Sequence, residues 1–208
     1  KVFKICFVVE YFFASIIILV TVLRGAGYGK AAFTREHFQD LGKLLFAFGV
    51  VFWAYIGYSQ YMLIWYANIP IETEWFVPRQ LGGWFFVSWL LIIGHFALPF
   101  VLLITRWTKR FRNILVLIAI WMLAMFIIDV YWLLMPMVPE VALAEATSWN
   151  QLQAAVDAGK VAIGWNPSIL NLTALLGMLG LVVCGTFFFL DRASLAPTAD
   201  PRLSEALA

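Results

Sequence analysis

Charged side chains are scarce in this sequence, and their scarcity excludes most classes of soluble protein. Only 12% of the 208 residues are Asp, Glu, Lys or Arg, whereas 63% are hydrophobic and the mean hydropathy is +0.90. A soluble globular domain has about 25% charged residues. The composition therefore predicts an integral membrane protein, with lipids as neighbours. The formal net charge of +2 is too small to indicate nucleic-acid binding.

Cysteine and histidine are also rare, with two residues of each. Cys6 and Cys184 lie in different hydrophobic runs and cannot form a CxxC or CxxCH motif, which excludes an iron–sulfur cluster or a covalent haem held by this chain alone. His95 is the only histidine inside a run, so a haem held by two histidines within the membrane is excluded as well. We expect no metal, no redox cofactor and no catalytic residue in this chain alone.

What the sequence does contain is five long apolar runs. Each is close to the roughly 20 residues that a helix needs to cross a bilayer. We therefore expect an all-α, polytopic transmembrane helix bundle. Because Lys1 leads directly into the first run, we also expect preceding helices and a larger bundle. The predicted spans are residues 2–23, 44–66, 84–104, 114–136 and 169–190.

The basic residues predict how this bundle is oriented. Four of them lie in the connection 24–43 and four in 105–113, whereas 67–83 contains only Arg79 and 137–168 only Lys160. By the positive-inside rule the first two connections are cytoplasmic and the other two external. The external loop 137–168 contains a predicted short helix. The tail, residues 191–208, is then an extended cytoplasmic segment.

Three ionisable residues lie well inside the runs: Glu10, His95 and Asp129. Such groups are costly in hydrocarbon and usually serve a function. Each also has a structural interpretation. Glu10 would be a protonated carboxyl bonded to a neighbour, His95 would be bonded to a backbone carbonyl where Pro99 loosens the helix, and Asp129 would be hydrated near the outer interface. All three fall between the middle of the membrane and its outer side, so a proton route through them would need its inner half from elsewhere.

The second run is unusually polar in its outer half. At helical spacing Tyr55, Ser59 and Met62 share one face, and Tyr58 and Tyr61 share an adjoining one. These tyrosines either pack with locally satisfied hydroxyls or form a functional stripe facing a neighbouring helix.

Two functions fit these side chains equally well at this level. Carboxyl, imidazole and phenol groups pass protons along a hydrogen-bonded chain, which makes Glu10, His95, Asp129, Tyr55 and Tyr58 candidates for a proton relay. A histidine beside aromatic residues would also suit a quinol pocket, formed by His95, Tyr55 and Tyr58. The residues by themselves do not separate the two.

Three segments of the sequence resemble a known protein family. They read LGKLLFAFGVVFWAYIGYSQYMLIWYANIPIETEWFVPR, then GHFALPFVLLITRWTKR, and finally DPRLSEALA. Together they resemble the F-type (ActF-type) membrane subunit of bacterial alternative complex III, which is similar to the larger NrfD/polysulfide-reductase-like membrane subunit of that complex. Residues 52–70 are the most specific part. The family protein is about twice as long, so the chain would be its C-terminal part.

The resemblance implies a multi-pass protein of the bacterial inner (cytoplasmic) membrane, within a complex that oxidises quinol. It implies that haem c and iron–sulfur clusters lie in cytochrome c and iron–sulfur subunits, and that the larger NrfD-like subunit is the better candidate for the quinol site. We therefore expect a structural and proton-conducting subunit, for which His95 and Asp129 are carried over as relay candidates. The alternatives are a quinol site in this chain, or a fragment of a secondary transporter, which should show paired broken helices in two repeats.

Overall fold

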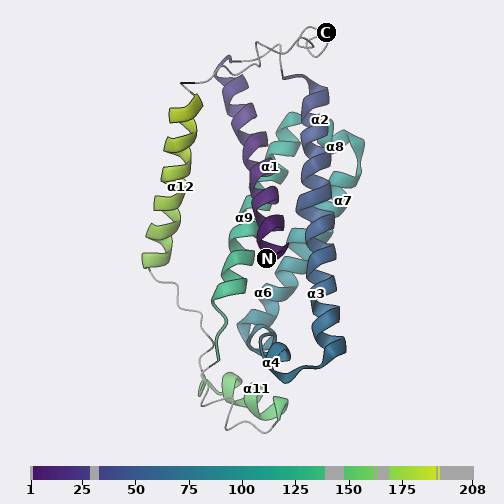
Figure 1. Cartoon of the computed structure of the whole chain (residues 1–208), viewed down its shortest axis with the longest axis vertical. Coiled ribbons are helices and arrows are strands. Elements are labelled where there is room, and N and C mark those ends of the chain that lie inside the picture. The colour runs from purple at the N-terminus through teal and green to yellow at the C-terminus, as the bar shows by residue number, and fades with distance from the viewer. Residues whose placement is uncertain are drawn as a thin grey trace. The chain divides into compact units, whose positions relative to one another are not determined.

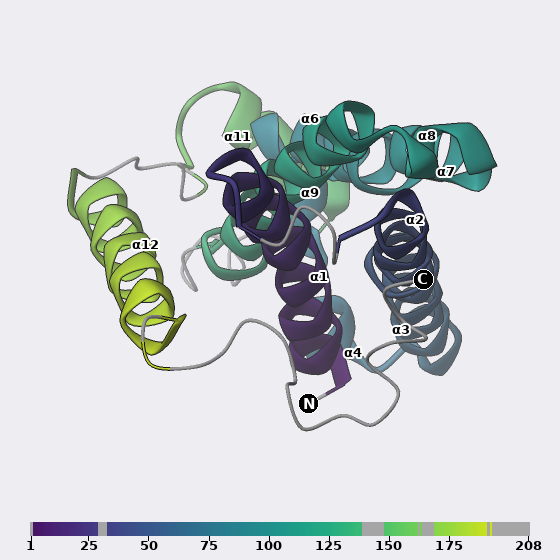
Figure 2. The same cartoon turned by 90° about the horizontal axis from the view of Figure 1, so that it is seen from above.

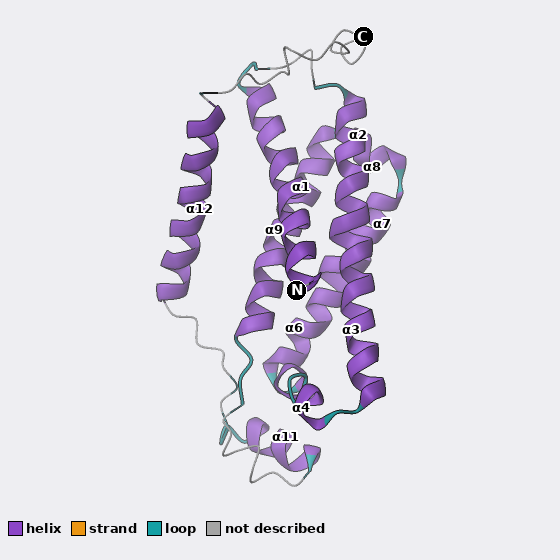
Figure 3. Cartoon of the chain, in the orientation of Figure 1, coloured by secondary structure: helices purple, strands orange, loops and turns teal. Residues whose placement is uncertain are grey.

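The computed structural model describes residues 2–28, 33–138, 148–161, 163, 169–190 and 192. All regular structure among them is helical, and no strand is found in these ranges (Figure 3). The tail 193–208 and residues 139–147 of the predicted external loop lie outside the described residues. The helices are α1 Val2–Gly25, α2 Arg35–Leu44, η1 Leu45–Phe52, α3 Trp53–Ala67, α4 Pro70–Thr73, α5 Val77–Gln80, α6 Gly83–Leu91, η2 Ile92–Ala97, α7 Leu98–Ile104, α8 Arg106–Arg110, α9 Arg112–Leu134, α11 Trp149–Asp157 and α12 Ile169–Leu190.

Four helical stretches are long and apolar enough to cross a membrane. They are Val8–Gly25, Arg35–Ala67, Gly83–Ile104 and Arg112–Leu134. The fifth predicted span coincides with α12, in which the stretch found to be apolar, Thr173–Phe189, is shorter. The four stretches follow the predicted spans closely, apart from the start of the second.

The second span is longer than the sequence predicted. We expected it to begin at residue 44, after the connection 24–43. Instead α2, η1 and α3 run on without a break over 33 residues. The local sequence permits this continuation, since no proline or helix-ending glycine interrupts the chain before Asn68. There the backbone turns left-handed, at φ +48°, and the Asn68 N–H bonds to Ile64 O, which ends α3.

The chain divides into two compact units, residues 1–22 with 35–165, and residues 23–34 with 166–208. The first contains every site described below. Its helices α1, α3, α6 and α9 are seen from the side in Figure 1 and from above in Figure 2. The second contains α12, where Arg192 lies 4.0 Å from the centre of the Phe188 ring.

The core of the first unit is built from stripes at helical spacing. In α1 the buried stripe is Glu10, Ala14, Ile17 and Val20, and in α9 it runs from Leu115 through Met122 and Met125 to Asp129. Residues three and four apart share a helix face, so each stripe is the face that meets neighbouring helices. Both stripes end in a carboxyl group. The fold therefore carries Glu10 and Asp129 into the core on the same faces that bury its apolar side chains.

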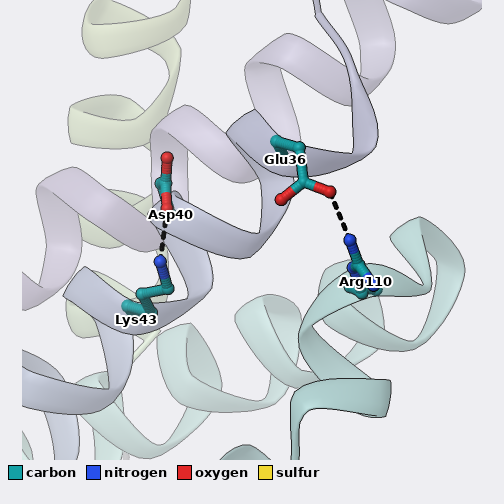
Figure 4. Close-up of polar contacts among 4 residues, drawn as sticks. All are labelled: Glu36, Asp40, Lys43 and Arg110. Carbon is teal, nitrogen blue, oxygen red and sulfur yellow. Dashed lines mark hydrogen bonds and ion pairs between the residues drawn. The ribbon is translucent and has the colours of Figure 1, made fainter.

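The amphipathic start of the long helix packs against α8. Two exposed ion pairs mark this end of the unit, Glu36 with Arg110 between the helices and Asp40 with Lys43 within α2 (Figure 4). A β-carbon on Gly42 would lie 2.9 Å from Cγ of Lys109, so the glycine allows α2 to approach α8 closely. The pKa of the Lys109 ammonium is lowered, mainly by burial and to a smaller extent by the nearby positive charges of Lys43 and Arg106.

Candidate functional site: a buried carboxyl and imidazole cluster

The structure brings Glu10, His95 and Asp129 together in the interior of the first unit. Glu10 comes from α1, His95 from η2 and Asp129 from α9, and each side chain is no more than 1% exposed. Nε2 of His95 lies 3.0 Å from Oε1 of Glu10. Asp129 is close enough to interact electrostatically with both. The three residues, which the sequence placed on three separate spans, therefore form one site.

Trp53 completes this site, although the sequence analysis did not single it out. Its indole N–H donates a 2.7 Å hydrogen bond to Oδ2 of Asp129. The same ring stacks on the His95 imidazole, with centroids 4.2 Å apart and planes 8° from parallel. A tryptophan in the middle of a span, rather than in an interfacial belt, needs a partner for its N–H, and that was the available signal. We refer to Glu10, Trp53, His95 and Asp129 as the polar cluster.

Irregular backbone flanks the polar cluster on two sides. His95 lies in the π-helical η2, which ends at Ala97, two residues before Pro99, and the π-helical η1 leads directly into Trp53. A proline lacks the N–H that would continue the α-helical ladder, and π-helical turns are frequent at functional sites. The loosening predicted at Pro99 thus takes the form of a π-helical segment that contains His95.

Close packing fixes the position of Glu10 and of the turn that carries His95. A β-carbon on Gly49 of η1 would lie 3.2 Å from Cγ of Glu10, so only glycine leaves Glu10 its full space. On the other side, the Trp121 indole donates a 2.8 Å hydrogen bond to the carbonyl of Gly94, the residue before His95. That bond uses a carbonyl in the irregular turn and holds the turn against α9.

The hydrogen-bonding capacity of Glu10 and His95 is not used up. Both carboxyl oxygens of Glu10 and both ring nitrogens of His95 are buried and complete no hydrogen bond of normal geometry with the protein, so the 3.0 Å approach is a close contact of a carboxyl with an imidazole and not an aligned hydrogen bond. Buried polar atoms are normally satisfied, and exceptions cluster at functional sites. A carboxyl and an imidazole this close can share one proton, which then belongs to the pair.

A large cavity reaches the polar cluster from one side. It has a volume of about 1290 Å³ and runs between α3 and α6, with α9 and α11 contributing to its walls. Most of its lining is aromatic or aliphatic, while Trp53 and Asp129 bring the polar cluster to its wall. His95 is fully buried behind the Trp53 ring.

The two candidate tyrosines are not in the polar cluster. Tyr55 and Tyr58 both line the cavity and are 63% and 66% exposed. Tyr55 stacks on Phe52, at 6.5 Å between ring centroids. The side-chain period of α3 explains the separation, because Tyr55 and Tyr58 point about 200° and 140° away from Trp53 around the helix axis. The structure therefore divides the five relay candidates into three that converge and two that line the approach to them.

A second buried charge, Arg79, lies in the same unit. In the sequence this residue served only to predict the orientation of the chain in the membrane. Arg79 is 3% exposed, and its guanidinium donates to the carbonyls of Trp75 and Leu133, the latter at 2.7 Å. Its central carbon lies 3.4 Å from the Trp75 ring centroid and 5.3 Å from that of Trp132. Burial lowers the pKa of the Arg79 guanidinium to about 10. We call Arg79, Trp75, Trp132 and Leu133 the arginine clamp.

Within the described ranges, no group of three or more His, Cys, Asp or Glu side chains is arranged to hold a metal ion. Comparison with known proteins adds no family to this picture: no protein-family model matches the chain, and no curated protein matches it significantly.

Proposed function

We propose that this chain is a membrane subunit of a bacterial quinol-oxidising complex of the alternative complex III type, and that it relays protons. One observation carries the relay: Glu10 and His95 approach to 3.0 Å in the interior, with Asp129 beside them. Three titratable groups placed together in a membrane bundle are costly unless they are used. The unsatisfied atoms of Glu10 and His95 leave room for a proton to be accepted and passed on.

The wider assignment rests on the sequence resemblance. In it α12 is the fifth span, the chain is part of a larger bundle in the bacterial inner membrane, and its C-terminus is cytoplasmic. The partners are a larger NrfD-like subunit, which is the better candidate for the quinol site, together with iron–sulfur and cytochrome c subunits that carry the clusters and haem c. Apolar side chains that the chain leaves exposed, among them Leu63 and Phe86, suit contacts with such partners and with lipid.

The relay is tested in the intact complex reconstituted in vesicles. His95→Gln and Asp129→Asn replace each titratable group with an uncharged amide of similar size. We expect proton release to fall while quinol oxidation continues when the membrane potential is dissipated. If both proton release and quinol oxidation stay at their wild-type rates in these variants, the relay is overturned.

Membership of the complex has a separate test. An affinity-tagged chain, isolated in mild detergent, should bring with it haem c absorbance and iron–sulfur signals in electron paramagnetic resonance. Isolation as a stable monomer without these cofactors would overturn the assignment and favour the transporter fragment.

The cavity supports a second candidate, a quinol site in this chain. Its aromatic walls and the carboxyl of Asp129 are the features expected of a pocket for an apolar ring with hydroxyl groups. In that case Tyr55→Leu with Tyr58→Leu should raise the KM for quinol, and Asp129→Asn should abolish electron transfer as well as proton release. Unchanged quinol kinetics in the tyrosine variant would leave the relay as the better account.

A further inference from the structure

One side chain separates the cavity from the buried pair of Glu10 and His95. Trp53 lines the cavity and lies flat on His95 at 4.2 Å, and His95 itself is fully buried. The stacked area of two parallel rings is the largest contact that a planar side chain can make. Water or solute in the cavity therefore meets the indole of Trp53 before it meets the imidazole.

The same ring also fixes the carboxyl that faces the cavity. Its N–H donates to Oδ2 of Asp129 at 2.7 Å, and an indole has only this one polar atom. A carboxyl can otherwise rotate freely about its terminal torsion. Trp53 thus holds Asp129 in one orientation and covers His95 in a single conformation, and a rotation of the ring would break both contacts at once.

Trp53 stands at a junction in the backbone where such a rotation is accommodated. It is the first residue of α3, and η1 ends at the residue before it. Its own N–H bonds to the carbonyl of Val50. A change from π-helical to α-helical winding shifts the register of the hydrogen bonds, which is how irregular turns allow local movement inside long helices.

We propose that Trp53 is the gate of the relay: it positions Asp129 and closes the route from the cavity to His95 and Glu10. This inference rests on the proposed relay. A proton that enters by way of Asp129 reaches the imidazole only where the indole permits. Trp53 is a positioning residue, since it holds no titratable proton in the range of the relay.

The closing role is tested by chemical access to the two histidines. Diethyl pyrocarbonate modifies exposed imidazole, and the chain contains only His37, which is exposed, and His95, which is not. In the full chain in bilayers, Trp53→Ala should raise modification of His95 by about tenfold relative to His37, because it opens a buried site to the cavity.

Trp132→Ala is the matched control for access. Trp132 also lines the cavity and also donates its indole N–H, to Ser88 Oγ at 2.8 Å, but it does not cover His95. It should leave His95 protected. Equal modification of His95 in both variants, or protection in both, would overturn the closing role. Because access is measured without turnover, this result stands apart from the fate of the relay.

The positioning role is tested in the reconstituted complex with Trp53→Phe, which keeps a stacked ring and loses the donor. Loss of one hydrogen bond of about 1.4 kcal/mol corresponds to about a tenfold fall in the bonded orientation, so proton release should fall about tenfold with His95 still protected. Trp132→Phe loses a comparable bond, to Ser88 Oγ, and should have little effect.

A double variant separates the gate from the relay. If Trp53 acts through Asp129, then Trp53→Phe adds nothing to Asp129→Asn. Wild-type proton release in Trp53→Phe, or effects that simply add, would overturn the positioning role. Unchanged proton release in Asp129→Asn itself would instead overturn the relay, which is a different outcome.

Discussion

The polar cluster and the arginine clamp bury charged groups in the same helical unit by opposite means. In the clamp, backbone carbonyls accept from the guanidinium and aromatic rings cover it, and it ties the segment before α6 to the end of α9. In the polar cluster an acid meets a base, while both carboxyl oxygens of Glu10 and both ring nitrogens of His95 lack hydrogen bonds.

The difference indicates which of the two is structural. A nearly satisfied buried charge with partners on two segments stabilises a connection, whereas a group left with free lone pairs or N–H donors costs stability. The contacts of the clamp with two segments therefore explain why its charge is buried. The unsatisfied groups of the polar cluster have no such structural explanation. Destabilising groups that are kept in the interior are typical of a functional site.

The largest effect should come from breaking the polar cluster. Glu10→Gln keeps the shape of the side chain and removes its ability to take up a proton. Proton release in the reconstituted complex should fall by at least about 100-fold, the lower range for one acid–base group, while the thermal stability of the chain in detergent stays the same or rises. A marked loss of stability together with normal proton release would make the polar cluster structural, like the clamp.

Breaking the arginine clamp should have the reverse effect. Arg79→Met keeps contact with the rings and leaves the carbonyls of Trp75 and Leu133 without their donor. The free energy of unfolding should fall by about 2 kcal/mol, since bonds from a charged donor outweigh the relief from burying the charge. Unfolding monitored by circular dichroism in detergent measures this, and proton release should remain near the wild-type rate.

The clamp should also respond to alkaline pH. The folded pKa of Arg79 is lowered to about 10, so above that pH the folded state releases a proton that the unfolded state still holds. The unfolded state then binds more protons, and the stability of the wild type rises with pH relative to Arg79→Met. The gap between their melting temperatures should widen from pH 9 to pH 11. A constant gap would show that the guanidinium keeps its ordinary pKa.

A smaller effect is expected where helix packing holds Glu10. Gly49→Ala places a β-carbon 3.2 Å from Cγ of Glu10 and should cost about 1 kcal/mol. It should also move the ¹⁵N signal of His95, but not that of His37, in histidine-labelled samples. Gly180→Ala in α12 has open space and should be neutral or stabilising by up to about 1 kcal/mol. Equal effects at both sites would mean that Glu10 is not tightly held.

The smallest effect should come from an exposed ion pair, which serves as a reference for the polar cluster and the arginine clamp. Glu36 and Arg110 form an exposed ion pair between α2 and α8 (Figure 4). Glu36→Gln should change stability by only about 0.3 kcal/mol, and less at high salt, because water and ions screen exposed charges. A larger loss would show that exposed pairs stabilise this chain as much as its buried charges do.

Much of the helical layout was predictable, because a run of about 20 apolar residues leaves the backbone few choices other than a helix. Four predicted spans have counterparts in helices of sufficient length, and α11 is a short helix within residues 137–168, where one was predicted. The start of the second span was not predicted, because the charged residues of α2 belong equally well to an interfacial turn. Packing on α8 decides that they continue the helix.

The helical character of the chain, the positions of its apolar helices and the ionisable residues within them, Glu10, His95 and Asp129, could be read directly from the sequence. Those properties follow from composition and period along one dimension. Helix packing brings the three residues together, keeps Tyr55 and Tyr58 apart from them, and places Trp53 between His95 and the cavity. Which face of one helix meets which face of another depends on the packing of side chains from distant segments, and no local pattern encodes it.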